Sequence, residues 1–418
     1  MKILFLTENF PPETNAAATR VFERACYWAR WGHDVTIITC APNFPQGKLY
    51  PNYKNSWHQT EVISGIRVVR VKTFIAPNKG TILRTLDFFS FLVTGIGAGL
   101  FQNKPDLIVA TSPQFFAAVA GWMLGLIRRV PFVFELGDLW PASIAAVGAM
   151  REKFLLRMME KLELYLYRKS AAIVALTNAF KDDLIGRGIK GDKIAVVING
   201  IDLPRYKPRP HDIELATEWD LTGCFIIGYV GTHGMAHGLR NVLNAAELLR
   251  NVPNLRFLLA GAGAEREQLF EEAKSRRLNN IVFLPPQPKE NMPAVWSLCD
   301  VALIHLKNSP VFAGVIPSKI FEAMGMGLPL LLAAPQGEAG KIITADRAGI
   351  CVPAENPKAL AEAALELMKN EKALKDYSRN SLKAAPLHSR ERQARLMIEV
   401  LEKVVRGEGD KVGSPAPS

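Results

Sequence analysis

Glycines and histidines stand directly after an apolar segment, 225–230, that we expect to form a buried strand. The following segment, 231–238, reads GTHGMAHG and begins with Gly231. Glycines let a backbone approach a ligand closely, and the imidazoles of His233 and His237 could donate hydrogen bonds to a phosphate. The alternative interpretation is a tight turn with surface histidines. The segment is therefore a candidate anion-binding turn.

A second glycine turn follows the next predicted strand, 256–260. Here Gly261 and Gly263 are separated by one residue. Such a pair is a weak signal, and the GxGxxG fingerprint of dinucleotide-binding enzymes is missing because Arg266 occupies its last position. The chain also contains no GxxxxGK[ST] loop, which excludes P-loop phosphate chemistry.

One lysine stands where helix electrostatics disfavour a cation. The segment 315–324 predicts a helix that begins after Pro317, with Ser318 as its N-cap and Lys319 in its first turn. The positive end of the helix dipole repels a cation, so Lys319 indicates a bound anion. Glu322 lies one turn further on the same face, where its carboxylate could accept hydrogen bonds from two ribose hydroxyls. The alternative is an ordinary exposed Lys–Glu helix start.

Carboxylates also follow a predicted strand in the first half of the chain, 132–135. Glu135 and Asp138 lie close together in sequence, and Trp140 follows them. Carboxylates and an aromatic ring at the end of a strand could grip a sugar or take a proton from a hydroxyl. The alternative is that Asp138 caps a turn. A long polar turn, 9–16, follows the first predicted strand and would also face a ligand.

These residues are positioned by a regular alternation of short apolar strands and amphipathic helices, which is typical of parallel α/β sheets. Ligands of such sheets bind at the carboxyl ends of the strands, where the candidate residues stand. A proline-rich segment after residue 199 divides the chain. We predict strands near residues 2–7, 35–39, 66–71, 107–110, 132–135, 173–176 and 195–198, and then 225–230, 256–260, 281–284, 301–305 and 329–333. The predicted organisation is an α/β domain over 1–205, a second over 206–385, a helix over 386–405 that returns to the first domain, and a disordered tail over 406–418.

Composition restricts the class of protein. The 418 residues are 49% hydrophobic and 22% charged, which excludes a disordered chain. The number of cysteines, five, is odd and no CxxC spacing occurs, so we expect a reducing compartment and no disulfide framework or zinc site. No HExxH spacing occurs either, and we assign no metal. The first apolar run is too short for a signal peptide, which favours a cytoplasmic location.

Positive charge is concentrated in the first half of the chain. The net charge is +11, and residues 1–205 hold 25 Lys and Arg against 16 Asp and Glu. An anionic partner is therefore expected, although a mildly basic soluble surface is the alternative. The segment 152–170 carries bulky apolar residues beside a basic stripe, which suits the inner face of the cell membrane or a lipid-diphosphate acceptor. A solvated basic face over an apolar core is the alternative there. The residues of the stripe are Lys153, Arg157, Lys161 and Arg168.

The chain resembles the retaining glycosyltransferases of family GT4, close to the fucosamine transferases of bacterial surface-polysaccharide synthesis. The order and spacing of several short segments over about 320 residues carry this resemblance. The segments are 9–20 (NFPPETNAAATR), 32–35 (GHDV), 42–47 (PNFPQG), 135–141 (ELGDLWP), 199–202 (NGID), 231–238 (GTHGMAHG) and 317–322 (PSKIFE).

The resemblance implies a GT-B fold, in which two Rossmann-like domains with parallel sheets face each other across a cleft. The second domain would bind a nucleotide-diphosphate sugar, with UDP as the expected nucleotide, and Glu322 would hold the ribose. The first domain would bind a lipid-linked or saccharide acceptor, and neither a metal nor nucleic acid would take part. The implied donor-binding residues are Gly231, His237, Gly261, Gly263, Leu284 (through backbone), Pro317, Ser318, Lys319 and Glu322. The implied acceptor-binding residues are Asn15, Arg20, Glu135 and Asp138, and the implied catalytic residues are Asp138, His233 and Lys319.

This sequence departs from the family pattern at several positions. The first Glu of the family's E-x7-E motif falls on Gly314, and the usual Arg and Lys of the first glycine turn fall on Thr232 and His237. We therefore expect the histidines to share the phosphate charge with Lys319, so that turnover falls as pH rises through the histidine range, about 6 to 7.5. A UDP-amino-sugar epimerase of the same fold and a non-catalytic partner subunit stay open as alternatives.

Overall fold

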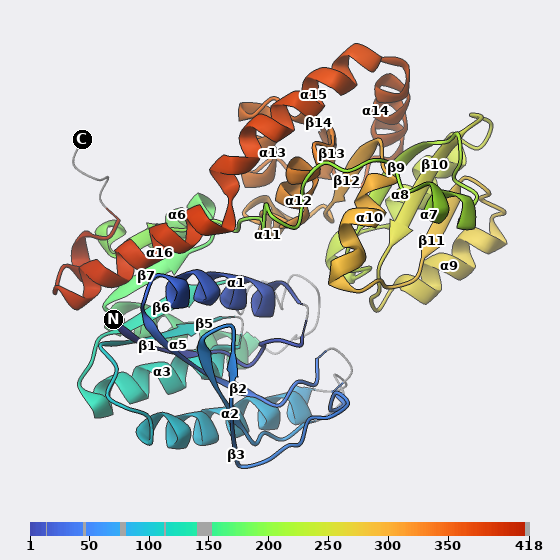
Figure 1. Cartoon of the computed structure of the whole chain (residues 1–418). Coiled ribbons are helices and arrows are strands. Elements are labelled where there is room, and N and C mark those ends of the chain that lie inside the picture. The colour runs from blue at the N-terminus through green and yellow to red at the C-terminus, as the bar shows by residue number, and fades with distance from the viewer. Residues whose placement is uncertain (14, 45–46, 76–80, 113, 140–152, 414–418) are drawn as a thin grey trace. The chain divides into compact units, whose positions relative to one another are not determined.

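In the computed structural model, the chain forms two compact α/β units (Figure 1). The structure describes all residues except 14, 45–46, 76–80, 113, 140–152 and 414–418. The first unit comprises residues 1–199 and 390–418, and the second comprises residues 200–389. Each unit is built around its own sheet, as the alternation of strands and helices in the sequence predicted.

The first unit contains an eight-stranded sheet with the order β3-β4-β2-β1-β5-β6-β7-β8. All neighbouring strands are parallel except β3 and β4, which are antiparallel. The central strands are almost wholly buried, because helices cover both faces of the sheet. The strands are β1 (Lys2–Leu6), β2 (Asp34–Cys40), β3 (His58–Ile63), β4 (Ile66–Val71), β5 (Leu107–Thr111), β6 (Phe132–Leu136), β7 (Ala172–Ala175) and β8 (Ile194–Val196).

Helices α1 (Ala16–Arg30) and α16 (Arg390–Val405) pack on one face of this sheet. The indole nitrogen of Trp28 in α1 donates a hydrogen bond of 2.9 Å to the carbonyl of Ala394 in α16. The last long helix thus belongs to the first unit. In sequence it is separated from the rest of that unit by the 190 residues of the second unit. The opposite face is covered by α2 (Thr81–Leu100), α3 (Phe115–Arg128), α5 (Lys153–Lys169) and α6 (Asn178–Gly186).

The segment after α16 is not the disordered tail that the sequence predicted. Residues 409–411 form a short 3-10 helix, and the amide of Gly413 donates a hydrogen bond of 2.7 Å to the carbonyl of Asp192. Val412 is buried in the core beside α16. This one apolar residue fixes a segment that is otherwise polar, which composition alone did not indicate. Residues 414–418 of the predicted tail lie outside the described residues.

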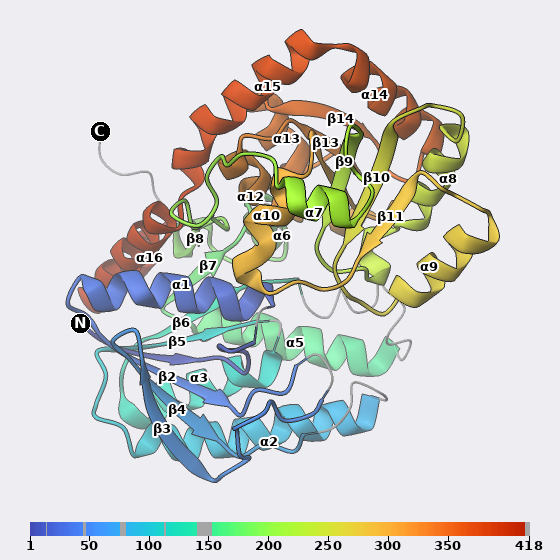
Figure 2. The ribbon, with the colours of Figure 1, turned by 45° about the vertical axis from the view of Figure 1, so that its right-hand side comes forward.

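The second unit contains a six-stranded parallel sheet with the order β11-β10-β9-β12-β13-β14 (Figure 2). Helices α8, α9 and α14 share one core with one face of the sheet. Gly228 faces the other side, where an added Cβ would lie 2.1 Å from the sulfur of Cys299, directly after α10. The strands are β9 (Phe225–Val230), β10 (Leu255–Ala260), β11 (Ile281–Leu284), β12 (Val301–His305), β13 (Leu330–Ala334) and β14 (Gly349–Pro353). The helices are α7 (Ile213–Glu218), α8 (Arg240–Leu248), α9 (Arg266–Ser275), α10 (Met292–Ser297), α11 (Pro310–Ala313), α12 (Lys319–Met326), α13 (Glu338–Ala345), α14 (Pro357–Lys369) and α15 (Glu371–Ala384).

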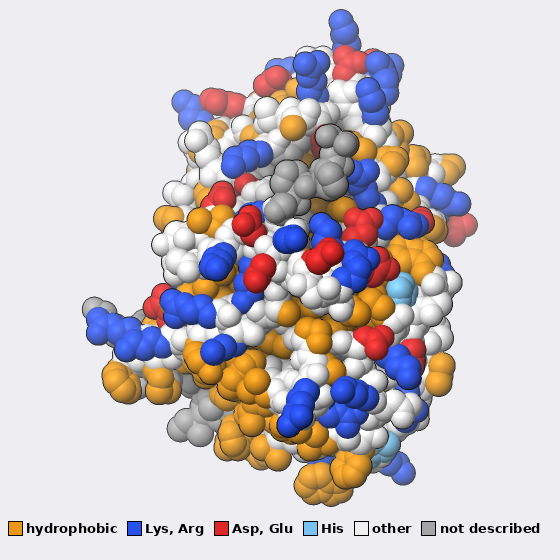
Figure 3. Space-filling view, turned by 90° about the vertical axis from the view of Figure 1, so that its left-hand side faces the viewer, with side chains coloured by type: hydrophobic (Ala, Val, Ile, Leu, Met, Phe, Trp, Pro, Cys, Tyr) orange, Lys and Arg blue, Asp and Glu red, His pale blue; other side chains and the backbone are white. Residues whose placement is uncertain are grey.

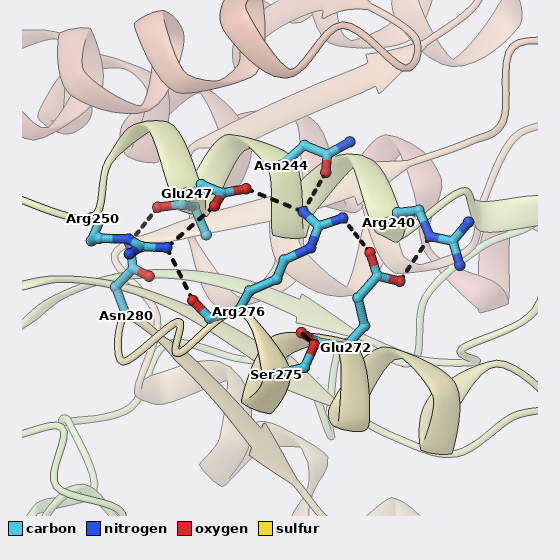
Figure 4. A network of polar contacts seen from close by, with 9 residues as sticks. Arg240, Asn244, Glu247, Arg250, Glu272, Ser275, Arg276 and Asn280 are labelled. Atoms are coloured by element: carbon cyan, nitrogen blue, oxygen red, sulfur yellow. Dashed lines mark hydrogen bonds and ion pairs between the residues drawn. The ribbon is translucent and has the colours of Figure 1, made fainter.

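A polar network joins α8 to α9 on the surface of the second unit (Figure 4). The guanidinium of Arg276 contacts Asn244 at 2.7 Å, Glu247 at 3.3 Å and the carboxylate of Glu272. Arg240 at the start of α8 donates to the same Glu272 at 2.8 Å. The network links the two helices that follow the two glycine turns.

Two edge strands have no counterpart among the predicted strands. Strand β3 is mostly polar and alternates between exposed and half-buried residues, and β14 has a short apolar run but no buried residue. The prediction was based on apolar runs, which identify strands buried on both faces and miss such edges. Among the described residues, no helix combines the length and the apolar character needed to cross a bilayer.

Candidate functional site

The two glycine turns of the second unit pack directly against each other. An added Cβ on Gly261 would lie 2.0 Å from the carbonyl oxygen of Gly231, and one on Gly263 would lie 2.3 Å from that of His233. The amide of His233 donates to the carbonyl of Ala262 at 2.8 Å. Gly261 and Gly263 also have φ of 142° and 155°, which side chains rarely adopt. These glycines are therefore required by turn-to-turn packing, whether or not a ligand also approaches them.

Lys319 lies beside the first turn, at the start of α12. Its side chain is buried, and its ammonium nitrogen lies 3.5 Å from the centroid of the Tyr229 ring. An added Cβ on Gly231 would lie 2.8 Å from that nitrogen, so a glycine at this position makes room for the ammonium. Within the described part of the chain, the nitrogen has no hydrogen-bond partner. Burial lowers the pKa of Lys319 to about 7, although the carboxylate of Glu322 raises it in part.

The N-terminus of α12 differs from the prediction in one respect. Ser318 stands at the N-cap position, but its side chain makes no capping hydrogen bond. It adopts helical dihedrals, φ −59° and ψ −27°, instead of the extended ones that a capping serine takes. Pro317 precedes it and is half-buried. The first turn of α12 therefore starts without the side-chain cap that the sequence predicted.

Glu322 is half-buried one turn along α12. The indole nitrogen of Trp296, in α10, donates to the carboxylate Oε2 at 3.4 Å. Trp296 is fully buried and was not identified from the sequence, because a tryptophan in an amphipathic helix looks like an ordinary core residue. The ring orients the carboxylate from a second helix.

In the unliganded protein, the two turn histidines have pKa values well below the ordinary 6.5. Burial and the neighbouring ammonium of Lys319 lower the pKa of His233 to about 4 and that of His237 to about 3. Both imidazoles are neutral at pH 7. His233 is also fully buried, and neither of its ring nitrogens has a partner among the described residues. The predicted fall of turnover between about pH 6 and 7.5 stays a prediction, and in the unliganded protein Lys319 is the group of this site whose pKa lies near 7.

The remaining donor-site prediction concerns the end of β11. Leu284 is fully buried, so its side chain belongs to the core. Only its backbone could serve a ligand, which is what the resemblance implied. A cavity of about 400 Å³ lies between α8 and α9, beside the first glycine turn, whose Met235 and Gly238 line it. None of the individually predicted site residues lines this cavity. Arg240, Asn241, Lys307 and Glu355 are among its lining residues.

In the first unit, Glu135 and Arg20 belong to a buried ion cluster. The Glu135 carboxylate contacts Arg24 and lies 3.2 Å from the Nε of Arg20, and all three side chains are almost completely buried. Burial alone would raise the pKa of Glu135, but Arg24 and Arg20 outweigh it and lower the pKa below its ordinary value. The Nη2 of Arg20 also donates to Thr111 at 3.2 Å. The acceptor-binding role of Glu135 and Arg20 stays a prediction, and in the unliganded protein the two side chains are paired with each other.

Asn15 and Asp138, the other two predicted acceptor-binding residues, are both half-buried. The Oδ1 of Asn15 accepts a hydrogen bond of 2.9 Å from the amide of Ala18, so Asn15 caps α1. Asp138 follows Gly137, whose amide donates to the hydroxyl of Ser112 at 2.9 Å. Trp140, the predicted aromatic neighbour, lies outside the described residues. In the parts of the chain that the structure describes, no group of three or more His, Cys, Asp or Glu side chains is placed to hold a metal ion.

Comparison with known proteins places both units in one enzyme class. The family description "Glycosyltransferase Family 4" matches residues 17–205, and "Glycosyl transferases group 1" matches residues 220–384. A putative colanic acid biosynthesis glycosyl transferase of Escherichia coli, WcaI, is 26% identical over 395 residues, covering 91% of this chain and 96% of that protein.

Solved structures agree on the fold. Sucrose-phosphate synthase from Thermosynechococcus elongatus superposes with a TM-score of 0.80 at 16% identity, covering 97% of this chain and 99% of that one. Anabaena Alr3699/HepE in complex with UDP-glucose gives a TM-score of 0.73 at 18% identity, covering 96% of this chain and 100% of that one. The chain therefore belongs to the family 4 glycosyltransferases and is a transferase of the GT-B fold.

Proposed function

We propose that this protein is a retaining glycosyltransferase that takes a sugar from a UDP-sugar and passes it to a lipid-linked or saccharide acceptor in surface-polysaccharide synthesis. The observation that carries the proposal is the buried ammonium of Lys319, without a hydrogen-bond partner among the described residues and next to Gly231. A buried charge is costly unless an anion pairs with it, and a diphosphate is such an anion. The names of WcaI and of the Anabaena complex with UDP-glucose support the polysaccharide and the nucleotide, respectively.

The residues of the second unit suit the departure of a nucleoside diphosphate. When the bond between the sugar C1 and the diphosphate oxygen breaks, the oxygen keeps the electron pair and becomes negative. Lys319 and the amide groups at the start of α12 would stabilise that charge, which is the work a metal does in other transferases. We therefore expect no metal requirement. Glu322, oriented by Trp296, would hold the ribose hydroxyls. We assign the proton of the acceptor hydroxyl to Asp138 in the first unit.

Release of UDP separates this function from its alternatives. A transferase releases UDP from UDP-glucose or UDP-N-acetylglucosamine faster when a lipid-linked acceptor extract is added, and radiolabel from the sugar enters the lipid fraction. An epimerase changes the sugar without any acceptor, and a non-catalytic subunit does neither. Absence of label transfer with every UDP-, GDP- and dTDP-sugar offered would contradict the proposal.

We further propose that the first unit binds the anionic inner face of the membrane through the outer surface of α5. Phe154 and Met158 are 82% and 53% exposed, and Leu162 and Tyr165 continue this apolar stripe at helical spacing. The ring of Tyr165 contacts that of Trp122 in α3, with centroids 5.4 Å apart, so the apolar surface extends over a second helix. Of the predicted basic stripe, Arg157, Lys161 and Arg168 are exposed beside these residues, and the side chain of Lys153 lies outside the described set.

Apolar and basic side chains occur together on this part of the molecule. In the lower half of Figure 3, hydrophobic side chains form a broad area with lysine and arginine side chains among them. Exposed apolar residues also occur at the ends of α2 and α3, where Phe101 is 87% and Leu126 is 60% exposed. An apolar face bordered by cations is the pattern of proteins that lie on a membrane surface.

Removal of three charges from this surface should release the protein from anionic vesicles. Each basic residue near such a surface contributes about 1 kcal/mol, so the triple variant R157S/K161S/R168S should bind at least tenfold more weakly. Co-sedimentation with phosphatidylglycerol and phosphatidylcholine vesicles measures this. The matched control is K358S/K375S/R379S, which removes three exposed cations from the second unit. If both triple variants lost vesicle binding equally, or if the wild-type protein bound both kinds of vesicle equally, α5 would not be a site for anionic membranes. Its exposed surface would then simply face solvent.

A further inference from the structure

Two histidines of the second unit each place a ring nitrogen within hydrogen-bond distance of the other's backbone carbonyl. The Nδ1 of His237 lies 3.3 Å from the carbonyl oxygen of His305, and the Nδ1 of His305 lies 2.6 Å from the carbonyl oxygen of His237. The amide of Lys307 donates to the carbonyl of Ala236 at 2.9 Å. The first glycine turn is thus fastened to the end of β12 by three hydrogen bonds.

This geometry fixes the tautomer of His305. A carbonyl oxygen only accepts, so the Nδ1 of His305 must carry the proton. The ring is fully buried, which lowers the pKa of His305 to about 4, although Glu355 raises it in part and Lys319 lowers it further. A neutral ring has one proton, so Nε2 carries a lone pair. The amide nitrogen of Asn241 lies 2.8 Å from that Nε2 and donates to it.

The same argument fixes His237. Its Nδ1 faces the carbonyl of His305 and carries the proton, and its burial beside Lys319, His305 and His233 keeps the ring neutral. The Nε2 of His237 is therefore an acceptor. The ring centroid lies 5.8 Å from that of Tyr229, the ring that also contacts the Lys319 ammonium. His237 thus stands at the candidate donor site with a lone pair available and no ring proton to offer from Nε2.

We propose that the Nε2 of His237 accepts a hydrogen bond from a hydroxyl of the donor's sugar, and that His305 and Asn241 are positioning residues that fix this orientation. The assignment rests on the proposed function. The oxygens of an ionised diphosphate are acceptors only, so they cannot bond to an unprotonated Nε2, whereas a sugar hydroxyl can donate to it. The structure thus assigns His237 to sugar recognition and leaves the phosphates to Lys319.

Nuclear magnetic resonance tests the tautomers without any ligand. In protein with 15N-labelled histidine, His237 and His305 should both show a protonated Nδ1 and an unprotonated Nε2 from about pH 6 to 8. The variant N241D cannot donate to His305, so its His305 Nε2 should become protonated while the signal of His237 keeps its pattern. Protonation of His237 at Nε2 in the wild-type protein would overturn the proposal.

Binding of two probes tests the role in sugar recognition. The variant His237→Asn keeps an N–H group for the carbonyl of His305 and removes the ring acceptor. Its affinity for UDP should stay within about twofold of wild type, while its affinity for UDP-glucose or UDP-N-acetylglucosamine should fall about tenfold. Equal losses for UDP and the sugar nucleotides would show a phosphate contact, and no loss for either would show a structural role only. Both results overturn the assignment, as does a wild-type protein that binds UDP but neither sugar nucleotide. Failure of the proposed function is distinguishable, because then the wild-type protein binds no nucleotide at all.

Discussion

Glu322→Ala should weaken the binding of UDP by about 10- to 150-fold, because a carboxylate that accepts two ribose hydroxyls contributes about 1.5–3 kcal/mol. The carboxylate is half-buried on α12 and already oriented by the indole of Trp296, so its removal takes away a preformed acceptor. Isothermal titration calorimetry with UDP measures the loss. Thermal unfolding of the unliganded variant should change little, since the side chain is not part of the core.

Two further variants show whether the effect belongs to this carboxylate. Glu362→Ala removes an exposed glutamate of α14 and should leave UDP affinity unchanged. Trp296→Phe keeps an aromatic ring in the core and loses only the indole N–H, so it should produce a smaller loss than Glu322→Ala. Unchanged UDP affinity in Glu322→Ala would show that the ribose lies elsewhere.

Lys319→Met should cause a loss of similar size at pH 7 and should also abolish a pH dependence. In the free protein the pKa of Lys319 is lowered to about 7, and a bound diphosphate favours the charged form. Above that pH, UDP binding must take up a proton, so wild-type affinity should fall by up to about tenfold per pH unit between about pH 7.5 and 9. Below pH 7 the lysine is already charged, and its contribution to affinity is fully present.

Calorimetry in buffers with different ionisation enthalpies detects that proton uptake directly. At pH 8.5 the wild-type protein should take up close to one proton per UDP bound, and Lys319→Met should take up none from this group. Lys341→Met, which removes a lysine that is 77% exposed, serves as the control. Because the Lys319 ammonium is buried without a hydrogen-bond partner among the described residues, its replacement should not lower the melting temperature of the unliganded protein. Equal proton uptake by the wild-type protein and Lys319→Met would show that Lys319 does not bind the diphosphate.

The sequence predicted those features that depend on local order along the chain. Buried parallel strands appear as apolar runs, and Lys319 attracted notice because a cation at a helix N-terminus conflicts with the dipole. The glycines of the turns were also found, although the structure shows that Gly261 and Gly263 accommodate the backbone of the other turn. Local patterns therefore identified the residues of the candidate donor site.

Features that depend on partners distant in sequence could not be predicted from local patterns. Glu135 follows a strand, as an acceptor-binding carboxylate would, but Arg24 lies 111 residues earlier in sequence and reaches it only in the folded sheet. The neutral state of His233 and His237 comes from burial and from Lys319, more than 80 residues later, so residue type alone suggested the opposite charge. Val412 and Trp296 likewise take their roles from residues distant in sequence.

A crystal structure of the protein with UDP would show whether Lys319 binds the diphosphate. We expect the diphosphate within hydrogen-bond distance of the Lys319 ammonium and the start of α12, with both ribose hydroxyls on the Glu322 carboxylate. A nucleotide bound in the cavity between α8 and α9, against Arg240 and Lys307, or one that leaves Lys319 without an anionic neighbour, would contradict it.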